Sequence, residues 1–196
     1  MSVSVIILYK DGIKANEVKV WDLMKKEKMH ITILTTGGTI EKIYDEFEGS
    51  LQNRETIVKN KILQKLRLPS TEINIHCLMS KDSLTMVEKD RAIILDAIRL
   101  HEKNGHPILC LHGTDTLENT ASYCFENHPG ISVPVIFTGA MKPLGFDDSD
   151  APQNVIEAIF AARIMKPGYY VTFHGQLFHV PNVTKNKMLG TFEEKE

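Results

Sequence analysis

The 196-residue sequence lacks several short motifs that identify common enzyme classes. It contains neither GxGxxG nor a glycine-rich loop ending in GKS or GKT, which argues against nucleotide binding. It also lacks GxSxG, the turn that carries the serine of α/β-hydrolases. No run of like charges occurs, and 23 Lys and Arg nearly balance 25 Asp and Glu. We therefore expect no nucleic-acid partner and no membrane partner; small, roughly neutral ligands fit the composition better.

Cysteine and long apolar stretches are also scarce. The three cysteines, Cys77, Cys110 and Cys124, are an odd number without CxxC spacing, and Cys77 and Cys110 lie in apolar runs where a reduced, buried thiol is ordinary. This usage indicates a cytoplasmic protein. No stretch approaches the roughly 18 apolar residues that cross a bilayer. The apolar start of the chain has no basic segment before it and no small-residue cleavage site after it, so we expect no signal peptide.

Strand-like apolar runs alternate with segments of helical spacing along most of the chain. The runs cover residues 30–36, 72–79, 107–113, 133–139 and 169–175, and helical spacing falls at residues 58–66, 94–98 and 155–162. This alternation predicts an α/β fold: a three-layer, doubly wound, mostly parallel sheet with helices on both faces. Thr85 and Glu88 have the spacing of a capping box, which predicts that a helix starts at Thr85.

Residues 1–28 stand apart from this pattern. Their two apolar segments flank an Asp11-Gly12 turn, which predicts a short β-hairpin ahead of the main domain. Alternatively, Met29 is itself an initiator and the preceding residues are a dispensable extension. In both cases the expected domain covers residues 29–196.

Hydroxyl, glycine and charged residues follow each strand-like run, so they gather at the carboxyl edge of the predicted sheet, where such folds bind ligands. Thr114 and Asp115 lie in one of these loops. They indicate either chemistry or a simple helix cap, since Asp and Thr side chains accept hydrogen bonds from helix amides. Thr36 lies at the mouth of a glycine turn, and a threonine nucleophile needs a neighbour to take its proton. Lys185, beyond the last run, is either that proton acceptor or an ordinary solvated lysine.

Metal binding is not expected. His174 and His179 are five residues apart and His112 is isolated, so ligand spacing is missing. Asp147, Asp148 and Asp150 lie in a loop whose last aspartate caps the helix that begins near Pro152.

Taken together, the segments TTGGTI, KDSLTM, LHGTDTLENTA, TGAMKP with SDAPQN, and VTK resemble, in this order, the amino-terminal catalytic domain of the bacterial-type L-asparaginase family. TGGTI and HGTDT are that family's two signature segments. The resemblance runs from about Met29 to the end of the sequence. It implies hydrolysis of the side-chain amide of asparagine, and in some members glutamine, through a covalent acyl-threonine, without cofactor or metal.

The resemblance also implies catalytic roles at matching positions. Thr36 matches the nucleophile, and Tyr44, the first tyrosine after the glycine turn, matches a mobile-lid tyrosine that helps to remove its proton. Thr114 and Asp115 match a second catalytic hydroxyl and its partner, and Lys185 matches the lysine of that group.

The implied substrate-binding residues come from three segments. Ser83, preceded by Asp82, matches the serine that holds the substrate's α-carboxylate. Gly113 belongs to the HGTDT segment, and Ala140 matches a position whose backbone, with a threonine amide, binds the amide oxygen as it becomes an oxyanion. Fixed donors of this kind are worth roughly 3 to 4 kcal/mol.

Full-length members of the family continue into a second α/β domain, whereas this sequence ends at Glu196. The chain is therefore either a single-domain branch or a fragment with an incomplete site. Three functions stay open: an asparaginase, an amidase of the same chemistry for another small amide, and an amino-acid-binding or regulatory module without turnover. A lone domain of this kind leaves apolar surface to cover, so we expect a homodimer or a higher homo-oligomer.

Overall fold

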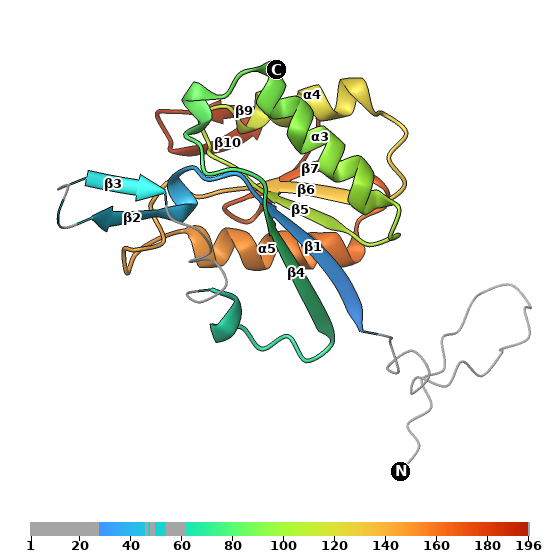
Figure 1. Ribbon diagram of the computed structural model, residues 1–196, viewed down its shortest axis with the longest axis horizontal. Coiled ribbons are helices and arrows are strands. Elements are labelled where there is room, and N and C mark those ends of the chain that lie inside the picture. The colour runs from blue at the N-terminus through green and yellow to red at the C-terminus, as the bar shows by residue number, and fades with distance from the viewer. Residues whose placement is uncertain (1–27, 46, 48–49, 54–61, 196) are drawn as a thin grey trace, which may run out of the picture.

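The computed structural model describes residues 28–45, 47, 50–53 and 62–195. One six-stranded sheet forms its centre, with the strands in the order β4-β1-β5-β6-β7-β8 (Figure 1). The first five strands in this order run parallel, and β8 is antiparallel to β7. The strands are β1 (Met29–Thr35), β4 (Thr71–Cys77), β5 (Ile108–Leu111), β6 (Pro134–Thr138), β7 (Gly168–Phe173) and β8 (Gln176–His179). The predicted mostly parallel sheet is confirmed. The last residue of each predicted run lies within two residues of the last residue of the corresponding strand.

Helices cover both faces of this sheet. Helices α3 (Glu88–Glu102) and α4 (Leu117–Asn127) lie on one face, and α5 (Ala151–Ile164) lies on the other (Figure 1). Neighbouring residues of β5 show the consequence: Cys110 is buried with Ile98 of α3, whereas Leu109 is buried with Ile159 of α5. A strand buried on both sides needs apolar residues at every position, which is why these strands appear in the sequence as continuous apolar runs.

Several short elements complete the described structure. Two antiparallel hairpins stand outside the main sheet: β2 (Lys42–Asp45) with β3 (Ser50–Asn53), and β9 (Val183–Asn186) with β10 (Thr191–Glu194). The short 3₁₀ turns are η1 (Thr39–Glu41), η2 (Leu63–Lys65) and η3 (Ser83–Thr85). None of the described helices has the length and apolar character that a membrane crossing requires.

The structure corrects some local predictions. Helix α3 begins at Glu88 rather than at Thr85, because Thr85 belongs to η3 and its hydroxyl donates to the Asp82 carbonyl. The carboxylate that accepts an N–H at this helix start is that of Asp90, 2.8 Å from the Val87 nitrogen. The helix expected at residues 58–66 is limited to the single turn η2 in its described part.

Two further predictions concern the amino-terminal residues and the cysteines. The hairpin predicted within residues 1–28 lies outside the described residues, apart from Lys28. Among the cysteines, Cys110 and Cys124 are buried free thiols, but Cys77 is exposed because it ends the edge strand β4.

Candidate active site

The loops after β1, β5 and β6 begin side by side at the carboxyl edge of the sheet. The Thr36 N–H donates to the Leu111 carbonyl at 3.1 Å, and the His112 N–H donates to the Thr138 carbonyl at 2.9 Å. These bonds continue the strand pairing by one residue beyond each strand. The glycine turn, the HGTDT segment and the TGAMK segment therefore leave the sheet next to one another.

Glycines let these loops touch. Gly38 has a φ of +81°, and a Cβ on it would lie 2.5 Å from the Gly113 Cα. A Cβ on Gly113 would in turn lie 2.6 Å from the Ser83 Oγ, and one on Gly139 would lie 3.3 Å from the Thr114 Cγ2. Side chains larger than hydrogen do not fit at these contacts, so the four loops form one packed surface.

Lys185 meets Thr114 and Asp115 in this surface. Its Nζ lies 2.8 Å from the Thr114 Oγ1 and 2.7 Å from the Asp115 Oδ1. The Lys185 side chain is 13% exposed, and its backbone N–H donates to the Glu118 carboxylate at 2.6 Å. A lysine between a hydroxyl and a carboxylate can pass a proton to or from the hydroxyl. Lys185 is therefore a paired and largely buried lysine rather than a solvated one, and its role in proton transfer stays a prediction.

The loop does not use its side chains to cap the next helix. Thr116 occupies the N-cap position of α4 but makes no side-chain cap bond. Its hydroxyl donates instead to the Ser83 carbonyl at 2.9 Å. The capping alternative is therefore wrong for this loop, because the Asp115 and Thr116 side chains make contacts to other segments.

Thr36, the predicted nucleophile, is a buried and hydrogen-bonded residue. It is 0% exposed, and its Oγ1 donates to the Leu111 carbonyl at 3.1 Å. This hydrogen bond joins the start of the glycine turn to β5, and the role of Thr36 as nucleophile stays a prediction. Thr39, by contrast, is partly exposed and begins η1 directly after Gly38, the glycine that touches Gly113.

Thr39 is a second candidate that the predicted site does not include, although the sequence offers it. The TGGT segment has a threonine on each side of its glycine pair, and β1 ends at Thr35. A residue one step past a buried strand continues the strand pairing, whereas a residue beyond two glycines has left the sheet. The second threonine of the segment is consequently the better candidate for contact with a ligand.

Ser83 and Asp82 have different surroundings. Ser83 is buried against Gly113, in the surface described above. Asp82 instead binds the Lys42 Nζ at 2.9 Å and the Leu84 N–H at 3.0 Å. The hydrogen bond from Lys42, followed by the one from the Leu84 N–H, lowers the pKa of Asp82. Asp82 therefore ties the base of the β2–β3 hairpin to η3, and its proposed contact with substrate stays a prediction.

The remaining predicted residues lie close to these loops. Ala140 is fully buried in the turn that follows β6, and Gly113 contributes its backbone to the packed surface. Tyr44 lies in β2 opposite Leu51, but its side chain is outside the described part, so its role as a lid residue stays a prediction.

His112 is a buried polar residue directly behind the site. Its Nδ1 lies 2.8 Å from the Gly113 carbonyl and its Nε2 lies 2.9 Å from the Thr120 hydroxyl. A carbonyl only accepts, so Nδ1 carries the proton and Nε2 accepts from Thr120. Burial lowers the pKa of His112 to about 4. The neutral ring therefore fixes the HGTDT segment and carries no charge at neutral pH.

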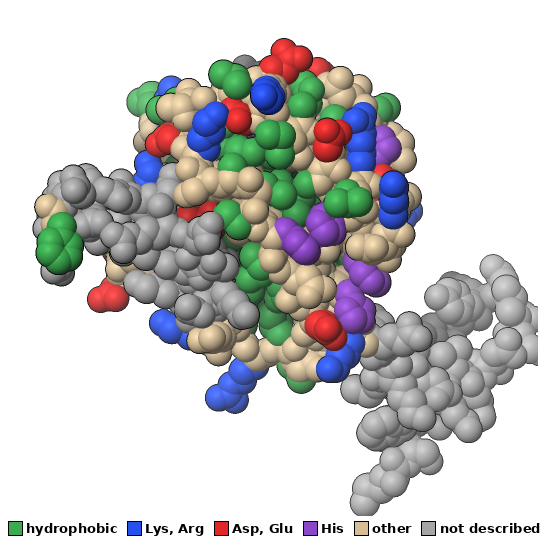
Figure 2. Space-filling model, in the orientation of Figure 1, with side chains coloured by type: hydrophobic (Ala, Val, Ile, Leu, Met, Phe, Trp, Pro, Cys, Tyr) green, Lys and Arg blue, Asp and Glu red, His purple; other side chains and the backbone are tan. Residues whose placement is uncertain are grey.

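Metal ligands do not converge in the described residues. Figure 2 shows histidines gathered on one face of the molecule, and two ring pairs are close: His76 with His101 at 4.4 Å between centroids, and His30 with His106 at 4.9 Å. No group of three or more His, Cys, Asp or Glu in the described part could hold a metal ion.

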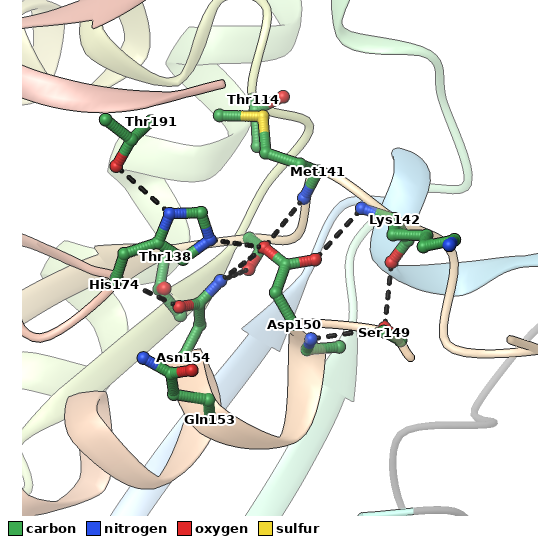
Figure 3. A network of polar contacts seen from close by, with 12 residues as sticks. Thr114, Thr138, Met141, Lys142, Ser149, Asp150, Gln153, Asn154, His174 and Thr191 are labelled. Carbon is green, nitrogen blue, oxygen red and sulfur yellow. Dashed lines mark hydrogen bonds and ion pairs between the residues drawn. The ribbon is translucent and has the colours of Figure 1, made fainter. Parts of the chain in front are cut away.

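The acidic loop before α5 has another task. Asp148 pairs with Lys142. Asp150 occupies the N-cap position of α5 but makes no side-chain cap bond, so its predicted capping role is wrong. Its carboxylate turns back to the backbone N–H groups of Met141 and Lys142, at 3.0 and 2.9 Å (Figure 3).

Comparisons with known proteins find relatives in one family. The family described as "Asparaginase, N-terminal" matches residues 30–194. The chain is 32% identical over 170 residues to an L-asparaginase of Thermococcus kodakarensis, covering 83% of this chain and 49% of that protein. It is 31% identical over 169 residues to a glutamyl-tRNA(Gln) amidotransferase subunit of Methanococcus vannielii, covering 83% of this chain and 38% of that protein.

Solved structures give the same result. The thermostable L-asparaginase from Thermococcus kodakarensis superposes with a TM-score of 0.74 at 28% identity, and L-asparaginase I from Vibrio cholerae with a TM-score of 0.74 at 26% identity. Each alignment covers 85% of this chain and 51% of the other chain. The chain thus spans about half or less of the length of these relatives.

Proposed function

Because the chain belongs to the asparaginase family, as the match over residues 30–194 shows, we propose that it is an amidohydrolase domain that cleaves the side-chain amide of L-asparagine through an acyl-threonine. The observation that carries the proposal is the Lys185 Nζ, 2.8 Å from the Thr114 Oγ1 and 2.7 Å from the Asp115 Oδ1. A hydroxyl held by a lysine and a carboxylate is a proton-transfer group, and here it adjoins the Gly38 turn.

The proposed reaction has two steps. In the first, a threonine hydroxyl adds to the amide carbon, the C–N bond breaks, and ammonia leaves as the ester forms. In the second, water adds to the ester and releases aspartate and the free threonine. Each step needs one proton removed from the attacking oxygen and one delivered to the leaving atom, and Thr114 with Lys185 moves these protons. The backbone at Ala140, with a threonine amide, stabilises the negative charge that forms on the carbonyl oxygen of the substrate in each step.

We assign the nucleophile to Thr39 rather than to Thr36. Two observations support this assignment. Thr39 is partly exposed, and it directly follows Gly38, which contacts Gly113 next to Thr114. The Thr36 hydroxyl is committed to the Leu111 carbonyl. Ser83, buried against Gly113, is proposed to bind the substrate's α-carboxylate.

A second candidate is an amidase with the same chemistry and another amide substrate, such as glutamine. The observation in its favour is the 31% identity to the amidotransferase subunit of Methanococcus vannielii, a protein named for a different reaction from the asparaginases. A cytoplasmic location fits both candidates, since three free cysteines, one of them exposed, suit a reducing compartment.

Ammonia release tests the proposal. The wild-type chain, Thr39→Val and Thr36→Val are each assayed with asparagine, glutamine and a panel of other small amides. We expect asparagine turnover in the wild type, loss of turnover in Thr39→Val, and retained turnover in Thr36→Val with lower thermal stability. Loss of activity only in Thr36→Val would refute the Thr39 assignment. Thermal stabilisation by asparagine without turnover would instead support a binding module.

A further inference from the structure

The turn between β7 and β8 contains a residue of unusual backbone conformation. His174 has a φ of +50° and Gly175 has a φ of +81°, between the paired residues Phe173 and Gln176. Two positive φ values match a tight hairpin turn, in which glycine or asparagine is the usual first residue. A non-glycine residue with a positive φ is uncommon, and histidine is one of the few residue types enriched there.

Both ring nitrogens of His174 make contacts to other segments. The Nε2 lies 3.0 Å from the Asp150 Oδ2, and the Nδ1 lies 3.1 Å from the Thr191 Oγ1 (Figure 3). A carboxylate only accepts, so the Nε2 N–H donates to Asp150, and the Nδ1 shares a hydrogen bond with the Thr191 hydroxyl. One side chain thus joins the loop before α5 to the strand β10.

Asp150 also binds the turn that contains Ala140. Besides His174, its carboxylate accepts from the N–H groups of Met141 and Lys142 and from the Asn154 amide, at 2.9 to 3.0 Å. Burial opposes the charge of Asp150, but these backbone hydrogen bonds and the one from His174 outweigh it and lower its pKa. The carboxylate is therefore ionised at neutral pH and holds all four donors.

These bonds fix both peptide groups that flank Ala140. The Met141 N–H belongs to the same planar peptide group as the Ala140 carbonyl, so its bond to Asp150 sets the direction of that carbonyl. Asn154 donates to the Gly139 carbonyl at 3.0 Å, which sets the direction of the Ala140 N–H in the same way. Gly139 in turn packs against the Thr114 methyl group.

The contact between His174 and Thr191 leads to the hairpin that contains Lys185. Thr191 is paired with Asn186 across the β9–β10 hairpin, and Lys185 is the neighbouring residue of β9, paired with Phe192. Starting at Thr114, the contacts run through Gly139, the Asn154 amide, Asp150, His174 and Thr191. They return through the hairpin to the Lys185 Nζ. The contacts form a closed ring in which His174 joins the two halves; the hairpin is also packed against β7 through Phe192, whose ring centroid lies 5.0 Å from that of Phe173.

We propose that His174 is a positioning residue that couples the Ala140 turn to the β9–β10 hairpin and thereby holds Lys185 against Thr114; its effect on catalysis rests on the function proposed above. The residue itself touches neither the threonine nor the lysine. Its contribution is geometric: small displacements of catalytic groups reduce rates strongly, even when they start far from the reacting atoms.

Three variants isolate this role. Thr191→Val removes only the hydroxyl that His174 binds, and Thr191→Ser restores it. His174→Asn keeps a residue that tolerates positive φ but is too short to bridge Asp150 and Thr191. The matched control is Thr71→Val, which removes a hydroxyl bonded to Arg163 at 2.8 Å at the amino end of β4. We expect Thr191→Val and His174→Asn to lower kcat by about tenfold with KM within twofold, Thr191→Ser to recover, and Thr71→Val to match the wild type.

Native-state hydrogen exchange gives a readout that does not depend on activity. The Lys142 N–H donates to Asp150 and the Lys185 N–H donates to Glu118, in the two halves of the ring. In Thr191→Val we expect faster exchange at both amides and at Met141, and no change in Thr71→Val. Unchanged exchange at Lys185 would overturn the coupling even if the wild type proves inactive. Faster exchange with an unchanged kcat in an active enzyme would overturn the positioning role.

Discussion

The Lys185 Nζ lies 2.8 Å from the Thr114 Oγ1, although the two residues are 71 positions apart in the chain. Thr114 follows the central strand β5, whereas Lys185 belongs to a hairpin outside the main sheet. The contact therefore depends on the packing of that hairpin against the carboxyl edge of the sheet.

Lys185→Met removes the amine and keeps a side chain of similar length. We expect the fold to persist and the maximal rate of amide hydrolysis to fall by at least about 100-fold, the usual contribution of a proton-transfer group. Asp115→Ala should reduce the rate comparably, and the double variant should be no worse than the more damaging single one, because residues that act as a unit are not additive. Steady-state kinetics of purified variants check this. A Lys185→Met protein with an unchanged maximal rate would return the lysine to a structural role.

The close contact between Gly38 and Gly113 can be tested by substitution. An alanine at Gly38 combines a φ of +81° with a Cβ 2.5 Å from the Gly113 backbone, so either the turn or the HGTDT segment must move. We expect Gly38→Ala to lower the free energy of unfolding by about 2 to 3 kcal/mol and to reduce activity. Urea denaturation provides the measurement.

The matched control for this change is Gly105→Ala. Gly105 also has a positive φ, +70°, but a Cβ there would meet nothing within 4 Å. It therefore reports the cost of a positive φ without a steric contact, about 1 kcal/mol. Equal destabilisation by the two substitutions would mean that the contact between Gly38 and Gly113 does not constrain the loops.

The central sheet could be predicted from the sequence because its strands are buried on both faces. Residues 31–35 of β1 and all residues of β5 and β6 are buried, and the only polar residues among them are threonines, so the apolar runs mark the strand ends closely. The later strands could not be found this way. In β8 only Phe178 is buried, and β9 and β10 are equally short, so neither length nor periodicity distinguishes them from loops.

The site is predictable where the family resemblance groups residues that residue type alone leaves open. Thr114, Asp115 and Lys185 are expected together from the sequence and do meet. Thr36 and Thr39 cannot be separated by residue type, since the difference lies in which of them the strand pairing buries. The sequence spacing of His174 argues only against metal binding, because the turn geometry and the tertiary contacts of both ring nitrogens are what reveal its task.

Acid should destabilise the protein through His112. Its folded-state pKa of about 4 lies below the ordinary value of 6.5. Between these pH values the unfolded chain binds a proton that the folded chain does not, so stability is complete above about pH 6.5 and falls as the pH decreases towards 4. Urea midpoints from pH 7 to 4.5 measure the slope. His112→Gln should be less stable at pH 7 but show a flatter decline, whereas the exposed His179→Gln should keep the wild-type slope; equal slopes in all three would remove His112 as the cause.

The last prediction concerns self-association and starts from the outer face of α5. Ile156, Phe160 and Ile164 lie one turn apart on this helix and are 37%, 61% and 60% exposed, so their side chains form an apolar stripe along it. Such a stripe is self-complementary: two copies related by a twofold axis can pack it antiparallel against itself. We therefore predict a homodimer through α5. Analytical ultracentrifugation at micromolar concentration should give a dimer for the wild type and for Met188→Glu, whose side chain is 97% exposed elsewhere, but a monomer for Phe160→Glu. A wild-type monomer, or a dimer that survives Phe160→Glu, would rule out this interface.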